Sequence, residues 1–182
     1  MIRHLLAHII LVSAMAGPQF AAAADDRAKL TVGVPAYVYH SDERVSPKGW
    51  NDGWFNNEGA LVDITWPIAN LTENTTLRAG ATAGGFDNSI FRTSIFAGGA
   101  GEIETYISPD WTLSFGSYAG LITGYNNAVN PAIAPYIGTT YAIANRIELG
   151  MRGYWLPAKT IGGSDLAESD AYVGAITIGT RF

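Results

Sequence analysis

The 182-residue sequence contains no cysteine, which excludes a disulfide framework, thiol catalysis and a thiolate metal site. It is also poor in positive charge, because 11 lysines and arginines stand against 16 aspartates and glutamates, for a net charge of −5. Such a chain has little basic surface for phosphate groups, which argues against nucleic acid as a partner. Neither a metal site nor a cofactor is expected.

Long apolar runs are almost missing as well. The one clear run, residues 5–16, is too short to span a bilayer as a helix. It follows a short basic start with Arg3 and precedes small residues at positions 21–24, a pattern typical of a cleaved secretory signal peptide. A retained N-terminal anchor is the alternative. We therefore expect residues 1–24 to be a signal peptide and residues 25–182 to form one domain.

What the sequence does contain is alternation with a period of two residues. In residues 172–182, apolar side chains such as Ile176 and Ile178 occupy even positions, whereas small or polar side chains occupy most odd positions. Similar segments, separated by turn residues, lie at 30–40, 60–66, 75–86, 93–106, 111–123, 133–142 and 146–155. Lipid-facing and lumen-facing side chains alternate in this way in membrane barrels. The sequence therefore predicts an all-β fold, an eight-stranded antiparallel transmembrane β-barrel.

The connections and the last residue indicate where such a barrel lies. The predicted turns after the second, fourth and sixth strands are short, and those after the first, fifth and seventh are long. With both termini in the periplasm, the long loops face outward from a bacterial outer membrane. The terminal Phe182 resembles the signal that hands such proteins to the barrel-assembly machinery. We expect a monomer whose partners are that machinery and the membrane lipids, lipopolysaccharide or phospholipid.

A soluble barrel of the lipocalin type is the alternative architecture. It would bury its apolar residues inward and would not need Trp66, Trp111 and Trp155 on the apolar face near strand ends. Aromatic residues at those positions are typical of the interfacial girdles of a membrane barrel.

The opposite, inward face is predicted to carry charge in the periplasmic half. Its charged residues are Asp63, Arg78, Glu102, Glu104, Glu148, Arg152 and Arg181. Because an isolated buried charge is very costly, these residues are expected to pair and to plug the barrel. We expect Arg78 to pair with Glu102 or Glu104, and Glu148 to pair with Arg181 or Arg152.

In the outer half, the same face is predicted to be apolar and in places hollowed by glycine. It carries Tyr37, Tyr39, Gly84, Phe96, Gly120, Ile122, Val173 and Ala175. Eight strands leave room only for side chains or for one small ligand. Two interpretations stay open: the aromatic residues fill a packed core, or they surround a bound acyl chain.

Prolines mark two neighbouring strand ends in this outer half. Pro131 and Pro135 enter the sixth strand, and Pro157 ends the seventh. Proline cannot donate to a strand ladder, so it is confined to edges, strand starts and bulges. A notch in the barrel wall, through which a lipid tail could enter sideways, is one interpretation. Simple strand termination is the other.

These features together resemble the outer-membrane lipid A palmitoyltransferase family. The matching segments are Pro131 to Pro135, residues 154–157 and the hairpin at residues 86–92. The resemblance implies an eight-stranded barrel with an interior acyl pocket that opens laterally between proline-flanked strands. The interior face and the prolines of this sequence give the predicted lipid-binding residues, which are Tyr37, Gly84, Phe96, Gly120, Pro131, Pro135 and Pro157. The amphipathic helix usual at the N-terminus of that family is missing from this sequence.

The same resemblance gives candidate catalytic residues for acyl transfer. The family's Asp-Ser pair aligns with Asn88 and Ser89, and its histidine aligns with Val34, six residues before His40. His40 could act as a base toward Ser89, with Asp87 orienting the imidazole. Two functions are therefore carried forward: a structural or lipid-binding barrel without chemistry, and a lipid A acyltransferase or related lipid-modifying enzyme.

Overall fold

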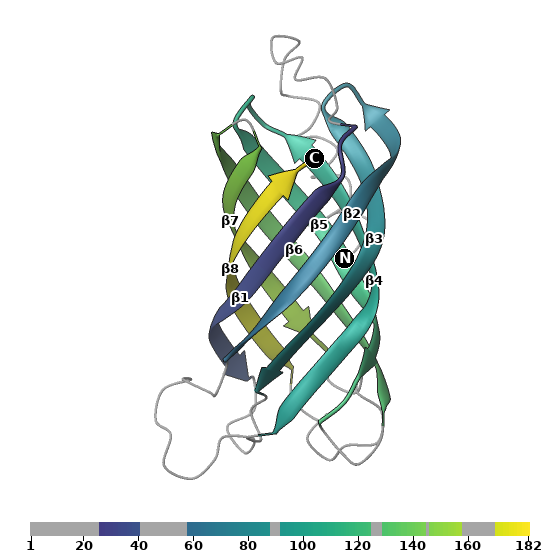
Figure 1. Cartoon of the computed structure of the whole chain (residues 1–182), viewed down its shortest axis with the longest axis vertical. Coiled ribbons are helices and arrows are strands. Elements are labelled where there is room, and N and C mark those ends of the chain that lie inside the picture. Colours follow the sequence, from purple (N-terminus) through teal and green to yellow (C-terminus); the bar gives the residue numbers. More distant parts are fainter. Residues whose placement is uncertain (1–25, 41–57, 88–91, 125–128, 145, 158–169) are drawn as a thin grey trace.

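The computed structural model describes residues 26–40, 58–87, 92–124, 129–144, 146–157 and 170–182. Within these ranges, strands β1 to β8 form a closed barrel in chain order, each antiparallel to the next, with β8 closing on β1 (Figure 1). Their bounds are β1 (Lys29–His40), β2 (Gly59–Thr72), β3 (Thr75–Asp87), β4 (Thr93–Tyr106), β5 (Trp111–Ile122), β6 (Asn130–Ala144), β7 (Ile147–Leu156) and β8 (Ala171–Arg181). The predicted fold class is confirmed.

The barrel has two different ends. Short connections at 73–74, 107–110 and 145–146 join β2 to β3, β4 to β5 and β6 to β7 at what we call the short-turn end. The first residues of β1 and the last residues of β8 lie at this end too. The strand ends that the other four connections join, at 41–58, 88–92, 123–129 and 157–170, lie at the opposite end, which we call the long-loop end. The predicted alternation of connection length is confirmed.

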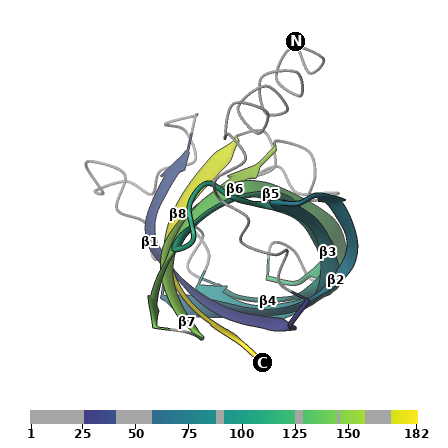
Figure 2. The ribbon, with the colours of Figure 1, turned by 90° about the horizontal axis from the view of Figure 1, so that it is seen from above.

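The alternation along the strands places apolar side chains on the outside of the barrel and charged side chains inside, the reverse of the arrangement in a soluble protein. Large apolar side chains on the outer wall are exposed, including Ile176, Met151 and Ile137. Figure 2 shows the strands as a closed ring seen from above. Lysine, arginine and glutamate side chains that face the interior of this ring are almost completely buried. The predicted outward positions of Trp66, Trp111 and Trp155 are confirmed by exposed fractions of 44–49%. No described helix is long and apolar enough to cross a bilayer.

Strand β2 is longer than predicted. The sequence predicts an end at Trp66, because the alternation stops there and a turn is expected at residues 70–74. The structure continues β2 to Thr72, with irregularities in its pairing with β3 between Pro67 and Ala69 and between Asn70 and Thr72. Bulges of this kind accommodate a proline within a strand because they interrupt the regular ladder.

Strand β1 contains a β-bulge at Ala36, which corrects one prediction. Thr31 and Gly33, before the bulge, are buried in the interior. After it, Tyr37 pairs with Gly174 and Tyr39 with Tyr172, on the outward side of β8. The prediction that Tyr37 and Tyr39 line the interior is wrong, because one extra residue moves every later side chain to the opposite face.

The ladder between β6 and β7 stops short of the long-loop end. It runs only as far as Tyr136 and Tyr154. Beyond that point, residues 130–135 of β6 pair with β5, and Trp155 and Leu156 pair with β8. Pro131 and Pro135 both lie in the part of β6 without a β7 partner. The two prolines therefore lack strand pairing on the β7 side only, and Pro157 follows the last residue of β7.

Candidate functional site

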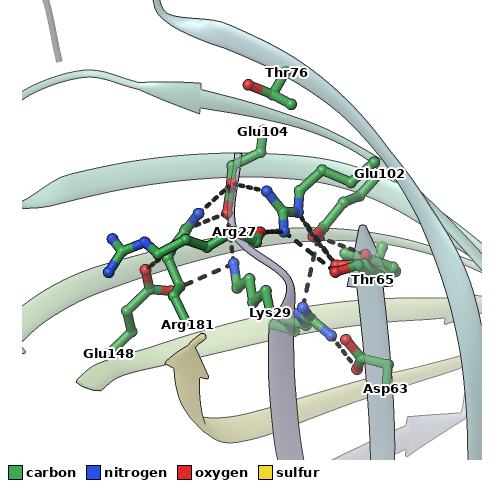
Figure 3. A network of polar contacts seen from close by, with 12 residues as sticks. Arg27, Lys29, Asp63, Thr65, Thr76, Glu102, Glu104, Glu148 and Arg181 are labelled. Atoms are coloured by element: carbon green, nitrogen blue, oxygen red, sulfur yellow. Dashed lines mark hydrogen bonds and ion pairs between the residues drawn. The ribbon is translucent and has the colours of Figure 1, made fainter. Parts of the chain in front are cut away.

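The short-turn half of the interior holds a network of ion pairs centred on Glu104 (Figure 3). Lys29 Nζ lies 2.5 Å from Glu104 Oε1, and Arg181 Nη2 lies 2.7 Å from the same oxygen. Arg78 Nη1 is 3.7 Å from Glu104 Oε2. Glu104 therefore forms ion pairs with cations from β1, β3 and β8, and these pairs link three strands to β4.

Glu148 and Glu102 extend this network on either side. Arg181 Nε donates to Glu148 Oε1, and Lys29 Nζ lies 3.4 Å from Glu148 Oε2. Arg78 Nε lies 3.9 Å from Glu102 Oε1 and donates to the Thr65 hydroxyl. The predicted pairings of Arg78 with Glu102 or Glu104, and of Glu148 with Arg181, are confirmed.

A second polar group lies next to this network, toward the long-loop end. Arg152 Nη1 donates to Asp63 Oδ1 at 2.8 Å and also donates to the Tyr118 hydroxyl. The Tyr118 hydroxyl in turn donates to Asp63 Oδ1 at 2.5 Å. Three strands, β2, β5 and β7, therefore meet across the barrel through one carboxylate oxygen.

The interior charge is balanced within the described residues. All seven predicted charged residues are buried, and Lys29 joins them with 1% exposure. With Lys29 included, four cations face four carboxylates. Lys29 is not among the predicted interior residues, because the predicted first strand begins at Leu30. The signal was present, since Lys29 has the same parity as the inward Thr31.

On the long-loop side of the charged residues, aromatic rings cross the interior and form what we call the aromatic layer. The Tyr118, Tyr136 and Tyr154 rings contact one another, with centroids 5.1–5.7 Å apart, and Phe96 packs at 6.4 Å from Tyr118. The Tyr136 hydroxyl donates to Glu102 Oε2 at 2.9 Å, and Arg152 lies over the Tyr136 ring. The tyrosines therefore lie between the ion-pair network of the short-turn half, which we call the ionic layer, and an apolar layer on the long-loop side.

The apolar layer occupies the long-loop half of the interior. Phe96, Ile122, Ala132 and Ala175 are buried there. Leu61, Phe86, Ala134 and Val173 pack on them but are only partly buried. The predicted apolar interior of the outer half, which is the long-loop half, is confirmed at Phe96, Ile122, Val173 and Ala175.

The predicted lipid-binding glycines have a different role from the one expected. A Cβ at Gly120 would lie 2.2 Å from the Ala97 carbonyl oxygen, and a Cβ at Gly84 would lie 2.3 Å from that of Ala60. Both glycines therefore allow neighbouring backbones to approach closely, rather than leaving space for a ligand. Gly98 and Gly120 are direct partners across β4 and β5.

Two of the three predicted catalytic side chains cannot be placed. Ser89 lies outside the described residues, and the side chain of His40 is also outside the described part, although its backbone ends β1. Asp87 ends β3, where its Oδ1 accepts a hydrogen bond from the Thr93 hydroxyl at 3.0 Å. In the described residues, no group of three or more potential metal ligands gathers.

Comparison with known proteins finds likeness at the level of fold. No protein-family model and no curated protein sequence matches the chain. Among solved structures, the Neisserial surface protein A (NspA) is 10% identical, with a TM-score of 0.56, over 85% of this chain and 96% of its own. Ail of Yersinia pestis is 11% identical with a TM-score of 0.49, over 87% and 100%. A de novo designed transmembrane β-barrel is 16% identical with a TM-score of 0.46, over 87% and 98%.

Proposed function

We propose that the protein is a small barrel of the bacterial outer membrane that binds a lipid acyl chain in the long-loop half of its interior. The apolar outer wall supports the membrane location, because a surface of exposed isoleucine, leucine and aromatic side chains needs an apolar solvent. The ionic layer and the tyrosines fill the short-turn half, so the barrel is not proposed to conduct solutes. The protein is instead a plugged scaffold.

The location gives a direct expectation. The protein is expected in the outer-membrane fraction, and the folded form is expected to migrate differently from the boiled form in a gel, because a closed barrel resists unfolding by detergent. Fractionation and paired unboiled and boiled gels measure this. A soluble periplasmic product without a heat-dependent shift would rule out the membrane barrel.

The strand pairing between β6 and β7 carries the acyl-chain proposal. The ladder ends at Tyr136 and Tyr154, so beyond them Pro131 and Pro135 pair with β5 but not with β7. The neighbouring interior face is apolar and partly exposed at Ala134 and Val173. An acyl chain that entered there would rest on the aromatic layer and need no charged partner. This is also the site that the resemblance to the lipid A palmitoyltransferase family implies.

Neighbouring positions on β6 test the acyl site. Ala134 faces inward and packs against the buried cluster, whereas Ile133 faces outward and is exposed. We expect Ala134→Trp to abolish the lipid retained by the purified protein, because the indole would occupy the space of the tail. Ile133→Trp is expected to retain it. Native mass spectrometry of both folded variants and the wild type measures the bound lipid, and equal retention in the two variants would contradict the interior site.

The enzymatic alternative, acyl transfer to lipid A by His40, Ser89 and Asp87, is separated by its product. Lipid A from cells with and without the protein can be compared by mass spectrometry. An added acyl chain that disappears in Ser89→Ala would support catalysis. Unchanged lipid A, together with lipid retained by the purified protein, would support binding alone.

A further inference from the structure

Between the ionic layer and the aromatic layer, several buried polar atoms have no hydrogen-bond partner among the residues that the structure describes. They are the hydroxyls of Thr31, Thr82 and Thr177, Oδ2 of Asp63, and Nε and Nη2 of Arg152. Each of these residues is at most 4% exposed. Unpartnered buried polar groups are rare in folded proteins and destabilise them, so such a concentration calls for a partner.

The strand register shows that the acceptors and hydroxyls form one row. Thr31 of β1 lies directly opposite Asp63 of β2, and Asp63 lies directly opposite Thr82 of β3. Directly opposed side chains in an antiparallel sheet have Cβ atoms about 4.5–5.5 Å apart. Thr177 of β8 lies directly opposite Gly33, two residues after Thr31, and is therefore a diagonal neighbour of Thr31 on the same inner face. The row therefore follows the inner wall over β8, β1, β2 and β3.

Arg152 meets the row at Asp63. Its Nη1 already donates to Asp63 Oδ1, and its Nη2 lies 3.6 Å from Glu102 Oε2, beyond hydrogen-bonding distance. Its free N–H groups and the free Asp63 oxygen therefore offer both donors and acceptors to a common guest. The threonine hydroxyls can serve in either role.

We propose that this row is a binding site for a cluster of ordered water molecules inside the barrel. The guest must be able to donate and accept, because Arg152 offers only donors and Asp63 Oδ2 only accepts. It must also be neutral, because the four buried cations and four buried carboxylates already balance, and an added ion would leave an uncompensated charge in the interior. Water meets both conditions and commonly bridges otherwise unsatisfied buried groups.

Replacing one hydroxyl by a methyl group of the same shape tests the site. We expect Thr82→Val to reduce the signal of long-lived water in oxygen-17 magnetic relaxation dispersion of the folded barrel. We also expect a lower urea midpoint of unfolding, because the bridging water would lose a partner. Thr180→Val on β8 is the control, since Thr180 has the parity of the outward-facing Ile176 and Ile178, and it should change neither quantity.

The opposite result is equally clear. If the hydroxyls are dry, wild-type protein shows no long-lived water signal, and Thr82→Val raises the urea midpoint because it removes an unsatisfied buried group. That outcome would overturn the proposal. Thr177→Val provides the same two readouts from the far end of the row if Thr82→Val does not fold.

Discussion

Glu104→Gln is expected to lower the free energy of unfolding by about 3–5 kcal/mol, the cost of breaking a buried ion pair by removing one partner. The glutamine has nearly the same shape but no charge, so Lys29, Arg78 and Arg181 lose the carboxylate that they share. Urea unfolding of the refolded barrel, followed by the gel shift between folded and unfolded forms, measures the change.

Glu73→Gln is the matched control for this experiment. Glu73 is exposed in the connection between β2 and β3, so the same chemical change is expected to alter stability by less than about 0.5 kcal/mol. Adding Lys29→Met to Glu104→Gln should restore part of the loss, because it removes one uncompensated cation. Equal midpoints for Glu104→Gln and Glu73→Gln would show that the ionic layer does not hold the barrel together.

Gly120→Ala is expected to destabilise the barrel by about 3 kcal/mol, the upper end of the usual cost of overpacking, or to prevent its folding. The new Cβ would lie 2.2 Å from the Ala97 carbonyl oxygen and 2.6 Å from the Gly98 Cα. Both atoms belong to the backbone of β4, so β4 and β5 would have to move apart. The yield of heat-modifiable folded protein and its urea midpoint measure the effect.

Gly101→Ala on the neighbouring strand is the control for backbone entropy. A Cβ at Gly101 meets nothing within 4 Å, and the residue lies on the outer wall opposite Ala79. The change is expected to be neutral or slightly stabilising, because alanine restricts the unfolded chain more than glycine does. If both variants fold with equal stability, the close approach of β4 and β5 at Gly120 is not required.

The aromatic interior bears on the choice between a packed core and a lipid chamber. The rings of Tyr118, Tyr136 and Tyr154 are packed against one another. Hydrogen bonds join Tyr118 to Asp63 and Arg152, and Tyr136 to Glu102. At the level of these three tyrosines, the contacts favour the packed core over the lipid chamber. The partly buried Ala134 and Val173 lie beyond the rings, and the acyl-chain proposal is confined to that level.

The alternating pattern by itself determined the fold and most of the orientation of the side chains. A strand has a period of two residues whatever surrounds it, so parity within one strand indicated that Glu102 and Glu104 face the same side. The apolar residues of the opposite parity marked the outward face of each strand, and so placed Arg152 inside as well. The cost of isolated buried charge then required them to pair. Both conclusions needed only local geometry and one general rule, and the structure bears them out.

Only the tertiary structure decided what depends on closing the barrel. The pairing of Lys29 with Glu104 joins residues 75 positions apart, and the bond of Tyr118 to Asp63 crosses the interior from β5 to β2. The bulge at Ala36 moves Tyr37 outward, and the approach of β4 to β5 explains Gly120. The physical reason is that a local pattern specifies which face a side chain takes, whereas bulges, strand spacing and cross-barrel partners follow from how all the strands fit together.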